Sequence, residues 1–208
     1  MAKEKVSVKF DRSQLIVFFA IFGIIAAVVA GYLIYEKELK PQHRAMFEGF
    51  PVEFRGELRE SQAVDVQPDE SKLRSQIVRP PKIEVNGSLI VRKPLGGATI
   101  AFKQTSDNST MSWYVVQSSE IAKKLTLLYK GKYDVDLKFN FTEVDSYEGL
   151  KGTNSYPVIA LVHPEFADGT YISVNDDTNV ITISGGDSLK DFDNAVTKFL
   201  MVALDIVV

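Results

Sequence analysis

The sequence predicts an α+β protein in which a single N-terminal transmembrane helix precedes a two-layer domain, with a mixed or antiparallel sheet and helices on one face. Two patterns lead to this prediction. An uncharged apolar run of 21 residues near the N-terminus is long enough to cross a bilayer. Beyond residue 82, segments with the two-residue period of a strand are interspersed with segments that have the helical period.

Length, charge and cysteine content limit what the protein can do. The 208 residues leave room for one ordinary domain in addition to an anchor and a connector. A net charge of -3 creates no field that would attract nucleic acid, so no nucleic-acid partner is predicted. The sequence has no cysteine, which excludes disulfides and thiolate metal sites. The domain is therefore expected to depend on its core, to which thirteen Phe and eight Tyr can contribute.

The apolar run extends from Leu15 to Tyr35 and predicts a transmembrane helix after a short cytoplasmic tail, residues 1–14. At about 1.5 Å per residue, the run spans a hydrocarbon core of about 30 Å, and a buried core helix is rarely this long. A cleaved secretory signal is the alternative, because small residues precede Gly31. The apolar run continues beyond Gly31, which a cleaved signal does not require, so a single-pass signal-anchor is favoured.

The orientation of this anchor is predicted from the residues on its two sides. Basic residues are nearly balanced, with Lys3, Lys5, Lys9 and Arg12 before the run and Lys37, Lys40, Arg44 and Arg55 after it. Acceptor triplets for N-glycosylation fall in the soluble part, at Asn86, Asn108 and Asn140. They favour a cytoplasmic N-terminus and an extracytoplasmic C-terminal domain at the cell membrane.

One face of the predicted anchor carries small residues. Gly23, Ala27 and Gly31 recur every four residues, a spacing that lets another helix approach closely. The predicted partners are therefore the lipid bilayer and, through this face, a partner protein or a second copy of the chain. The alternative is that small residues are simply common in membrane spans.

Residues 36–82 are expected to form a partly ordered connector, because they are mixed in charge and rich in proline. Asp69 is placed to cap a short helix from Ser71 to Ile77, which would end before Arg79-Pro80-Pro81. The sequence leaves open whether this stretch packs on the domain.

The soluble domain is expected to cover residues 83–208. Its first strands, Ile83–Val85 and Ser88–Val91, flank Asn86-Gly87, a dipeptide that favours a tight hairpin turn. Two further strands are predicted at Thr99–Phe102 and Trp113–Val116.

A helix is predicted next, capped by Ser118 or Ser119 and closed by Gly131, where a left-handed residue is favoured. Apolar and polar residues then alternate from Tyr133 to Thr142, which predicts a strand with one wet face.

The remainder predicts three strands and a final helix. Pro157–Val162 is almost continuously apolar, as in a strand covered on both faces, and Tyr171–Val174 and Val180–Ile183 flank a turn. Asp187 or Ser188 is placed to cap the last helix. Its polar residues, expected opposite the sheet-facing stripe, are Lys190, Asp191, Asn194, Thr197 and Lys198.

His163 is the only histidine in a position that suggests chemistry, because it ends an apolar strand and is followed by Glu165 and Asp168. Together they are weak candidates for a general base with nearby carboxylates, or for a metal ligand. The alternative is a partly buried structural histidine. His43 lies in the connector.

Gly185 and Gly186 join a strand to a helix N-terminus, where free backbone N–H groups can hold an anion. Asp187 fills the capping role itself, so a tight turn is favoured over a ligand loop. Acidic residues near the C-terminus do not match the calcium-loop spacing, so no metal site and no cofactor are predicted.

The sequence contains no catalytic constellation, and this favours a function without catalysis. The ending with Asp191-Phe192-Asp193 and Lys198-Phe199-Leu200 resembles the ends of uncharacterised archaeal surface proteins, a resemblance that implies no activity. We expect a membrane-anchored extracytoplasmic binding or assembly module of unknown ligand. An accessory subunit of a membrane or cell-envelope complex is a related hypothesis, for which the face of Gly23, Ala27 and Gly31 is the discriminating feature. A membrane-tethered hydrolase that uses His163 is the alternative.

Overall fold

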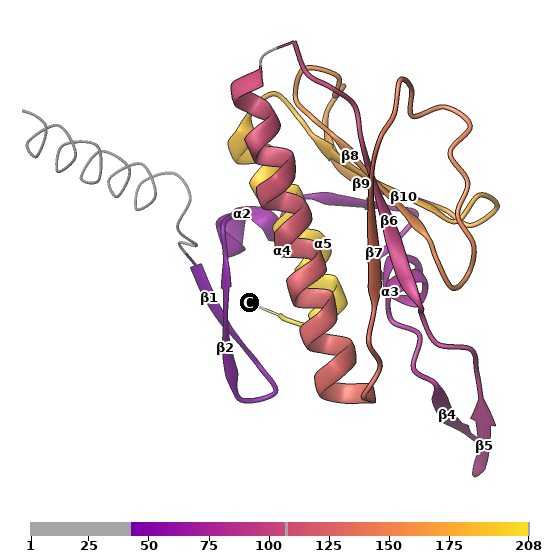
Figure 1. Ribbon diagram of the computed structural model, residues 1–208. Coiled ribbons are helices and arrows are strands. Elements are labelled where there is room, and N and C mark those ends of the chain that lie inside the picture. Colours follow the sequence, from indigo (N-terminus) through magenta and orange to yellow (C-terminus); the bar gives the residue numbers. More distant parts are fainter. Residues whose placement is uncertain (1–42, 107, 208) are drawn as a thin grey trace, which may run out of the picture. The chain divides into compact units, whose positions relative to one another are not determined.

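The computed structural model describes residues 43–106 and 108–207, all within one compact unit that spans Pro41–Val208 (Figure 1). The predicted anchor Leu15–Tyr35, its face of Gly23, Ala27 and Gly31, and the tail before it lie outside the described residues. Among the residues described, no helix is both long enough and apolar enough to span a membrane. The described part is α+β, with a mixed sheet and four helices.

A six-stranded mixed sheet forms the centre of the unit. Its order is β3 (Asp65–Gln67), β9 (Thr170–Asn175), β10 (Val180–Gly185), β8 (Val158–Val162), β6 (Gly97–Phe102) and β7 (Lys138–Glu143). Strands β10, β8, β6 and β7 run parallel to one another, whereas β9 and β3 run the other way. β7 is therefore one edge of the described sheet and β3 is the other.

Strand β8 is buried on both faces, as its apolar run predicted. Ile159 and Leu161 belong to the main core on one face. Val158 and Ala160 pack on the other face, where the β7–β8 connection contributes Val144, Tyr147 and Leu150.

Two long helices, α4 (Asn108–Tyr133) and α5 (Leu189–Leu204), lie on one face of the sheet (Figure 1). Ser188 caps α5 as predicted, and its Oγ accepts a hydrogen bond from the Asp191 N–H at 3.1 Å. The polar residues Asn194, Thr197 and Lys198 were expected to face away from the core, but they are buried. The reason is that α2 (Leu58–Gln62) and α3 (Glu70–Ile77) cover this side of α5.

The start of α4 corrects two sequence predictions. Trp113–Val116 is not a strand, and the helix does not begin at Ser118 or Ser119, because α4 already starts at Asn108. Gly131 lies inside α4, and the left-handed residue after the helix is Asp134. The buried stripe of Ile121, Leu125 and Leu128 extends back to Tyr114, so burial along one helix face overrides the strand propensity of the aromatic and β-branched residues. Consequently the strand predicted at Tyr133–Thr142 is shorter and becomes β7.

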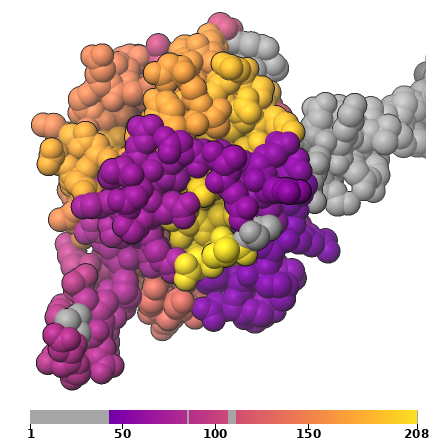
Figure 2. Space-filling view, turned by 180° about the vertical axis from the view of Figure 1, so that it is seen from behind, coloured from indigo at the N-terminus to yellow at the C-terminus, as the bar shows by residue number. Residues whose placement is uncertain are grey.

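The stretch before residue 82 packs on the domain. Its hairpin of β1 (His43–Phe47) and β2 (Phe50–Phe54) places Phe54 in the core, and α3 adds Leu73 and Ile77. Asp69 caps α3 as predicted, since its Oδ1 accepts from the Lys72 N–H at 2.9 Å. Figure 2 shows the C-terminal residues, in yellow, bordered by this N-terminal part in indigo and purple.

The predicted hairpin around Asn86-Gly87 is present, with β4 (Lys82–Val85) antiparallel to β5 (Ser88–Val91). Both turn residues have positive φ, 50° for Asn86 and 75° for Gly87, as this tight turn requires. The hairpin projects from the body of the domain (Figures 1 and 2). We call residues 82–91 the β4–β5 arm.

Candidate functional site

His163 directly follows β8, at the edge of the sheet where the carboxyl ends of the parallel strands meet and α/β proteins commonly bind ligands. Only 6% of the residue is exposed. The ring lies against Tyr114 and Phe192, with centroid distances of 5.7 and 6.3 Å. Nδ1 accepts a hydrogen bond from the Glu165 N–H at 3.2 Å, so the proton of the neutral ring is on Nε2. Nε2 is buried and has no partner among the described residues.

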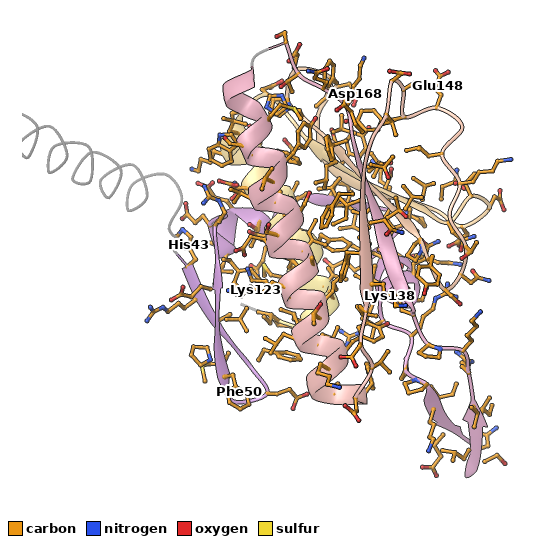
Figure 3. The ribbon with its side chains drawn as sticks, viewed as in Figure 1. His43, Phe50, Lys123, Lys138, Glu148 and Asp168 are labelled. Carbon is orange, nitrogen blue, oxygen red and sulfur yellow. The ribbon has the colours of Figure 1, made fainter. Side chains whose placement is uncertain are left out.

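Burial lowers the pKa of His163, and the Glu165 carboxylate only partly opposes this effect. The side chain of Glu165 instead accepts the Ser106 N–H, at 3.0 and 3.2 Å, and so holds the loop after β6. Asp168 is exposed near the upper end of the sheet in Figure 3. No hydrogen bond between described residues joins either carboxylate to the imidazole. The geometry therefore places His163 as a packed ring and does not favour it as a general base open to substrate.

Gly185 and Gly186 form a close-packed turn. A Cβ on Gly185 would lie 2.9 Å from Pro164 Cδ, and Gly186 has a φ of +62°. The Gly186 N–H already donates to Gly169 O at 3.2 Å. This N–H is therefore not available to an anion.

The three glycosylation candidates lie in different elements. Asn86 is exposed in the turn of the β4–β5 arm, Asn140 is exposed on β7, and Asn108 is the first residue of α4. Within the described ranges, no group of three or more His, Asp or Glu side chains is placed to hold a metal ion.

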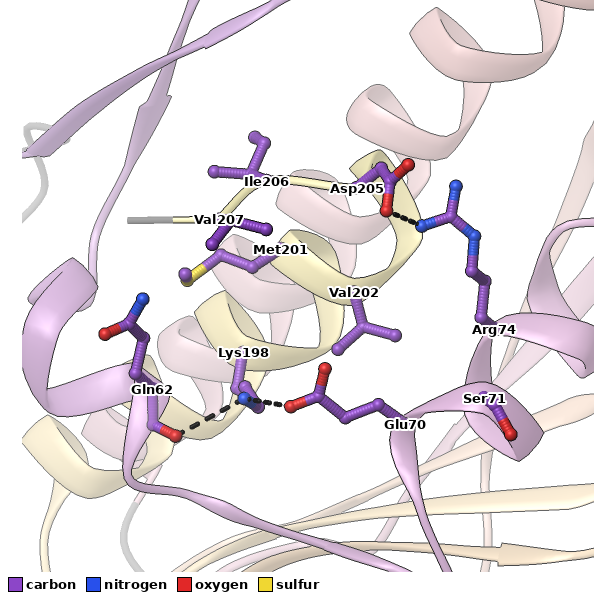
Figure 4. Close-up of a pocket in the computed structure, with 10 residues that line it drawn as sticks. All are labelled: Gln62, Glu70, Ser71, Arg74, Lys198, Met201, Val202, Asp205, Ile206 and Val207. Carbon is purple, nitrogen blue, oxygen red and sulfur yellow. Dashed lines mark hydrogen bonds and ion pairs between the residues drawn. The ribbon is translucent and has the colours of Figure 1, made fainter.

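A cavity of about 450 Å³ lies between α3 and α5 (Figure 4). Two of its lining residues are cations, and each is paired. Lys198 Nζ lies 2.5 Å from Glu70 Oε1 and 3.3 Å from Gln62 O, and Arg74 pairs with Asp205. The positive charge is thus neutralised inside the cavity, which gives no selectivity for an anion.

Sequence reasoning did not predict the pairing of two charged side chains that are largely buried, Asp193 and Lys124. Asp193 on α5 pairs with Arg55 at 3.4 Å and accepts from Gln117, and burial raises its pKa to about 6. Lys124 on α4 pairs with Glu120 and lies over the Phe54 ring. Glu120 lies one turn before Lys124 on α4, but Arg55, Gln117 and Phe54 are distant in sequence from the groups they contact, so residue spacing carried no signal for these three contacts.

A groove of about 290 Å³ runs between α4 and the edge strand β7. It is almost entirely apolar and is lined by Phe102, Met111, Tyr114, Val115, Ser118, Ser119 and Phe141. Phe141 is 55% exposed. Ser118 Oγ is buried and has no hydrogen-bond partner among the described residues. We call this surface, together with the outer edge of β7, the edge groove. It was not expected from the sequence, because Trp113–Val116 was predicted to be a strand and not part of α4.

The chain matches no family model, and comparison with curated proteins and with solved structures also found no match.

Proposed function

We propose that this chain is a membrane-anchored extracytoplasmic binding or assembly module, an accessory subunit of a membrane or cell-envelope complex. The edge groove carries the proposal. A strand at the edge of a sheet offers a row of unpaired N–H and C=O groups, and natural proteins usually cover or blunt such an edge. β7 is an edge of the described sheet and exposes Phe141 beside an apolar groove.

These features together support recognition by strand addition. A partner strand laid along β7 gains main-chain hydrogen bonds, and a neighbouring pocket selects its side chains. Phe141 and Val115, both exposed, provide apolar contact for such a side chain. The buried Ser118 Oγ adds one polar group within the groove.

Anchoring is supported by the sequence. Leu15–Tyr35 has the length and apolarity of a membrane span, and Gly23, Ala27 and Gly31 offer a second contact face within the bilayer. The hydrolase alternative gains no support, because His163 is packed between aromatic rings.

The test is purification of the tagged full-length chain from its native membrane in mild detergent, with mass spectrometry of the retained proteins. Phe141→Lys places a charge in the edge groove and is expected to remove the stoichiometric partner. Met46→Lys is the matched control, because Met46 is also an exposed apolar residue but lies on β1. Gly23→Leu with Ala27→Leu tests the membrane face separately.

Each outcome is informative. Loss of the partner with Phe141→Lys but not with Met46→Lys supports the edge groove as the binding surface. Equal retention by both variants, or a wild-type chain that is recovered as a lone monomer, would contradict the proposal.

A further inference from the structure

We propose that the edge groove of one copy receives the β4–β5 arm of a second copy, with β5 parallel to β7, so that the chain assembles with itself by strand exchange. The inference rests on the proposed function, because it names the occupant of the same groove.

The first observation is that the arm exposes apolar side chains in the part of the chain that the structure describes. Leu89 and Val91 are 65% and 72% exposed, and Ile90 is 40% exposed. Among the side chains described, none from the arm belongs to either hydrophobic core. A two-stranded hairpin alone is marginally stable in water, so an arm with this much apolar surface gains stability from a covering partner.

The second observation is complementary charge. Arg92 and Lys93 follow β5, whereas β7 ends at Glu143 and is followed by Asp145. A parallel alignment with Ile90 beside Phe141 also sets Arg92 beside Glu143. The antiparallel alignment through the same pair would set Lys93 against Lys138. The charges therefore favour the parallel arrangement, since like charges directly opposite each other destabilise a strand pair.

The third observation is that this register places Ile90 and Phe141 on the same face of the paired strands. Side chains alternate across a strand, so a strand paired in this way directs Ile90 to the same face as Phe141. Phe141 lines the groove against α4. The aliphatic side chain of Ile90 thereby enters a groove whose walls are mainly Phe, Tyr, Met and Val.

The arm is less suited to a lipid surface. Its tip is the polar sequence Asn86-Gly87-Ser88, and the cations Arg92 and Lys93 lie at its base. Both strands have an outer edge, and a bilayer core offers no hydrogen-bond partner to an open strand edge. A protein strand provides those partners.

The experiment uses the natural lack of cysteine. Two differently tagged full-length copies are co-expressed, one with Ile90→Cys and the other with Phe141→Cys, and are oxidised in the membrane. Directly paired strands bring Cα atoms within the range that a disulfide spans, so a disulfide between the two tags is expected. The control pairs Ile90→Cys with Asp177→Cys, an exposed site on the β9–β10 turn, and is expected to give none.

A charge exchange tests the register. Arg92→Glu or Glu143→Arg alone is expected to lower the disulfide yield about threefold, the scale of one surface ion pair, and the two together to restore it. Leu89→Cys should link to Phe141→Cys less than Ile90→Cys does, because Leu89 points to the other face.

Failure of this inference can be distinguished from failure of the proposed function. If Ile90→Cys and Phe141→Cys link no more than the control, while Phe141→Lys still removes a partner, strand exchange is overturned and the binding module stands. If Phe141→Lys also has no effect, both fail. A bimane label on Ile90→Cys that is quenched by brominated phosphatidylcholine in nanodiscs would assign the arm to lipid and also overturn strand exchange.

Discussion

Lys124 is a buried cation whose effect on stability depends on pH. Burial lowers its pKa to about 8, with Glu53 opposing the shift and Arg55 adding to it. Between pH 8 and the ordinary lysine range, the unfolded chain binds more protons than the native one, so this group makes stability rise with pH. The rise amounts to roughly 3 kcal/mol.

Lys124→Met is therefore expected to increase the free energy of unfolding at pH 7 and to flatten its rise between pH 8 and 9.5. Urea unfolding of residues 41–208 at several pH values measures both effects. A variant whose pH profile matches the wild type would show that Lys124 is not desolvated.

Asp193 changes the free energy of unfolding with pH in the opposite direction. Burial raises its pKa to about 6, although Arg55 and Gln117 oppose the shift. Between pH 4 and 6 the native state holds a proton that the unfolded state has released, so the contribution of this group falls as pH rises through that window. Asp193→Asn keeps an oxygen for Arg55 and Gln117, and is expected to remove this fall. Thermal unfolding from pH 4 to 7 checks it, and an unchanged slope would contradict it.

At this scale, the sequence predicted the residues whose role is local. Asp69 and Ser188 cap helices because their side chains accept hydrogen bonds from N–H groups only three residues later. Asn86-Gly87 forms a turn because both residues adopt positive φ. The contacts of Lys124 and Asp193 could not be predicted from the sequence, because Phe54 and Arg55 belong to a segment that was expected to be a connector.

Gly131 tests the corrected boundary of α4 at the scale of one element. It lies within the helix, and a Cβ built on it meets nothing within 4 Å. Gly131→Ala is expected to stabilise the domain by roughly 0.5–1 kcal/mol, because alanine favours a helix interior. Gly149→Ala is the control, since its φ of +75° should make alanine destabilising. Denaturant midpoints compare the two. Destabilisation by Gly131→Ala would support a left-handed residue at that position.

The elements that the sequence predicted well share a strong period or a strong turn signal. β8 was predicted from its continuous apolar run, β9 and β10 from the turn between them, and α5 from its helical period and its N-cap. β1, β2, α2 and β3 were not predicted, because the stretch that forms them is mixed in charge and interrupted by proline. Their contacts are also distant in sequence: β3 pairs with β9, Phe54 of β2 lies against Lys124 of α4, and α2 packs on α5. The edge groove could not be predicted from the sequence either, because it is formed by residues of α4 and β7 that come together only in the folded domain.

At the scale of the whole molecule, residues before position 83 form part of the core of the domain. Phe54, Leu73 and Ile77 are fully buried, and Gly56 is so close to α5 that a Cβ would lie 2.5 Å from Asp193 O. We expect residues 41–208 to unfold cooperatively and residues 83–208, the domain expected from sequence, to lack cooperative unfolding. Circular dichroism during urea titration measures both fragments. A sharp transition for residues 83–208 would show that the earlier segment is dispensable.

The contact between the Gly56 region and α5 also affects when the chain can fold during synthesis. The Gly56 N–H donates to Thr197 Oγ1, which is added 141 residues later. Until the ribosome has completed α5, the Gly56 N–H and the residues of α2 and α3 that pack on α5 lack their partner. A chain that stops before Leu189 therefore leaves these residues open to proteases and chaperones, so quality control can distinguish finished molecules from truncated ones by the exposure of α2 and α3.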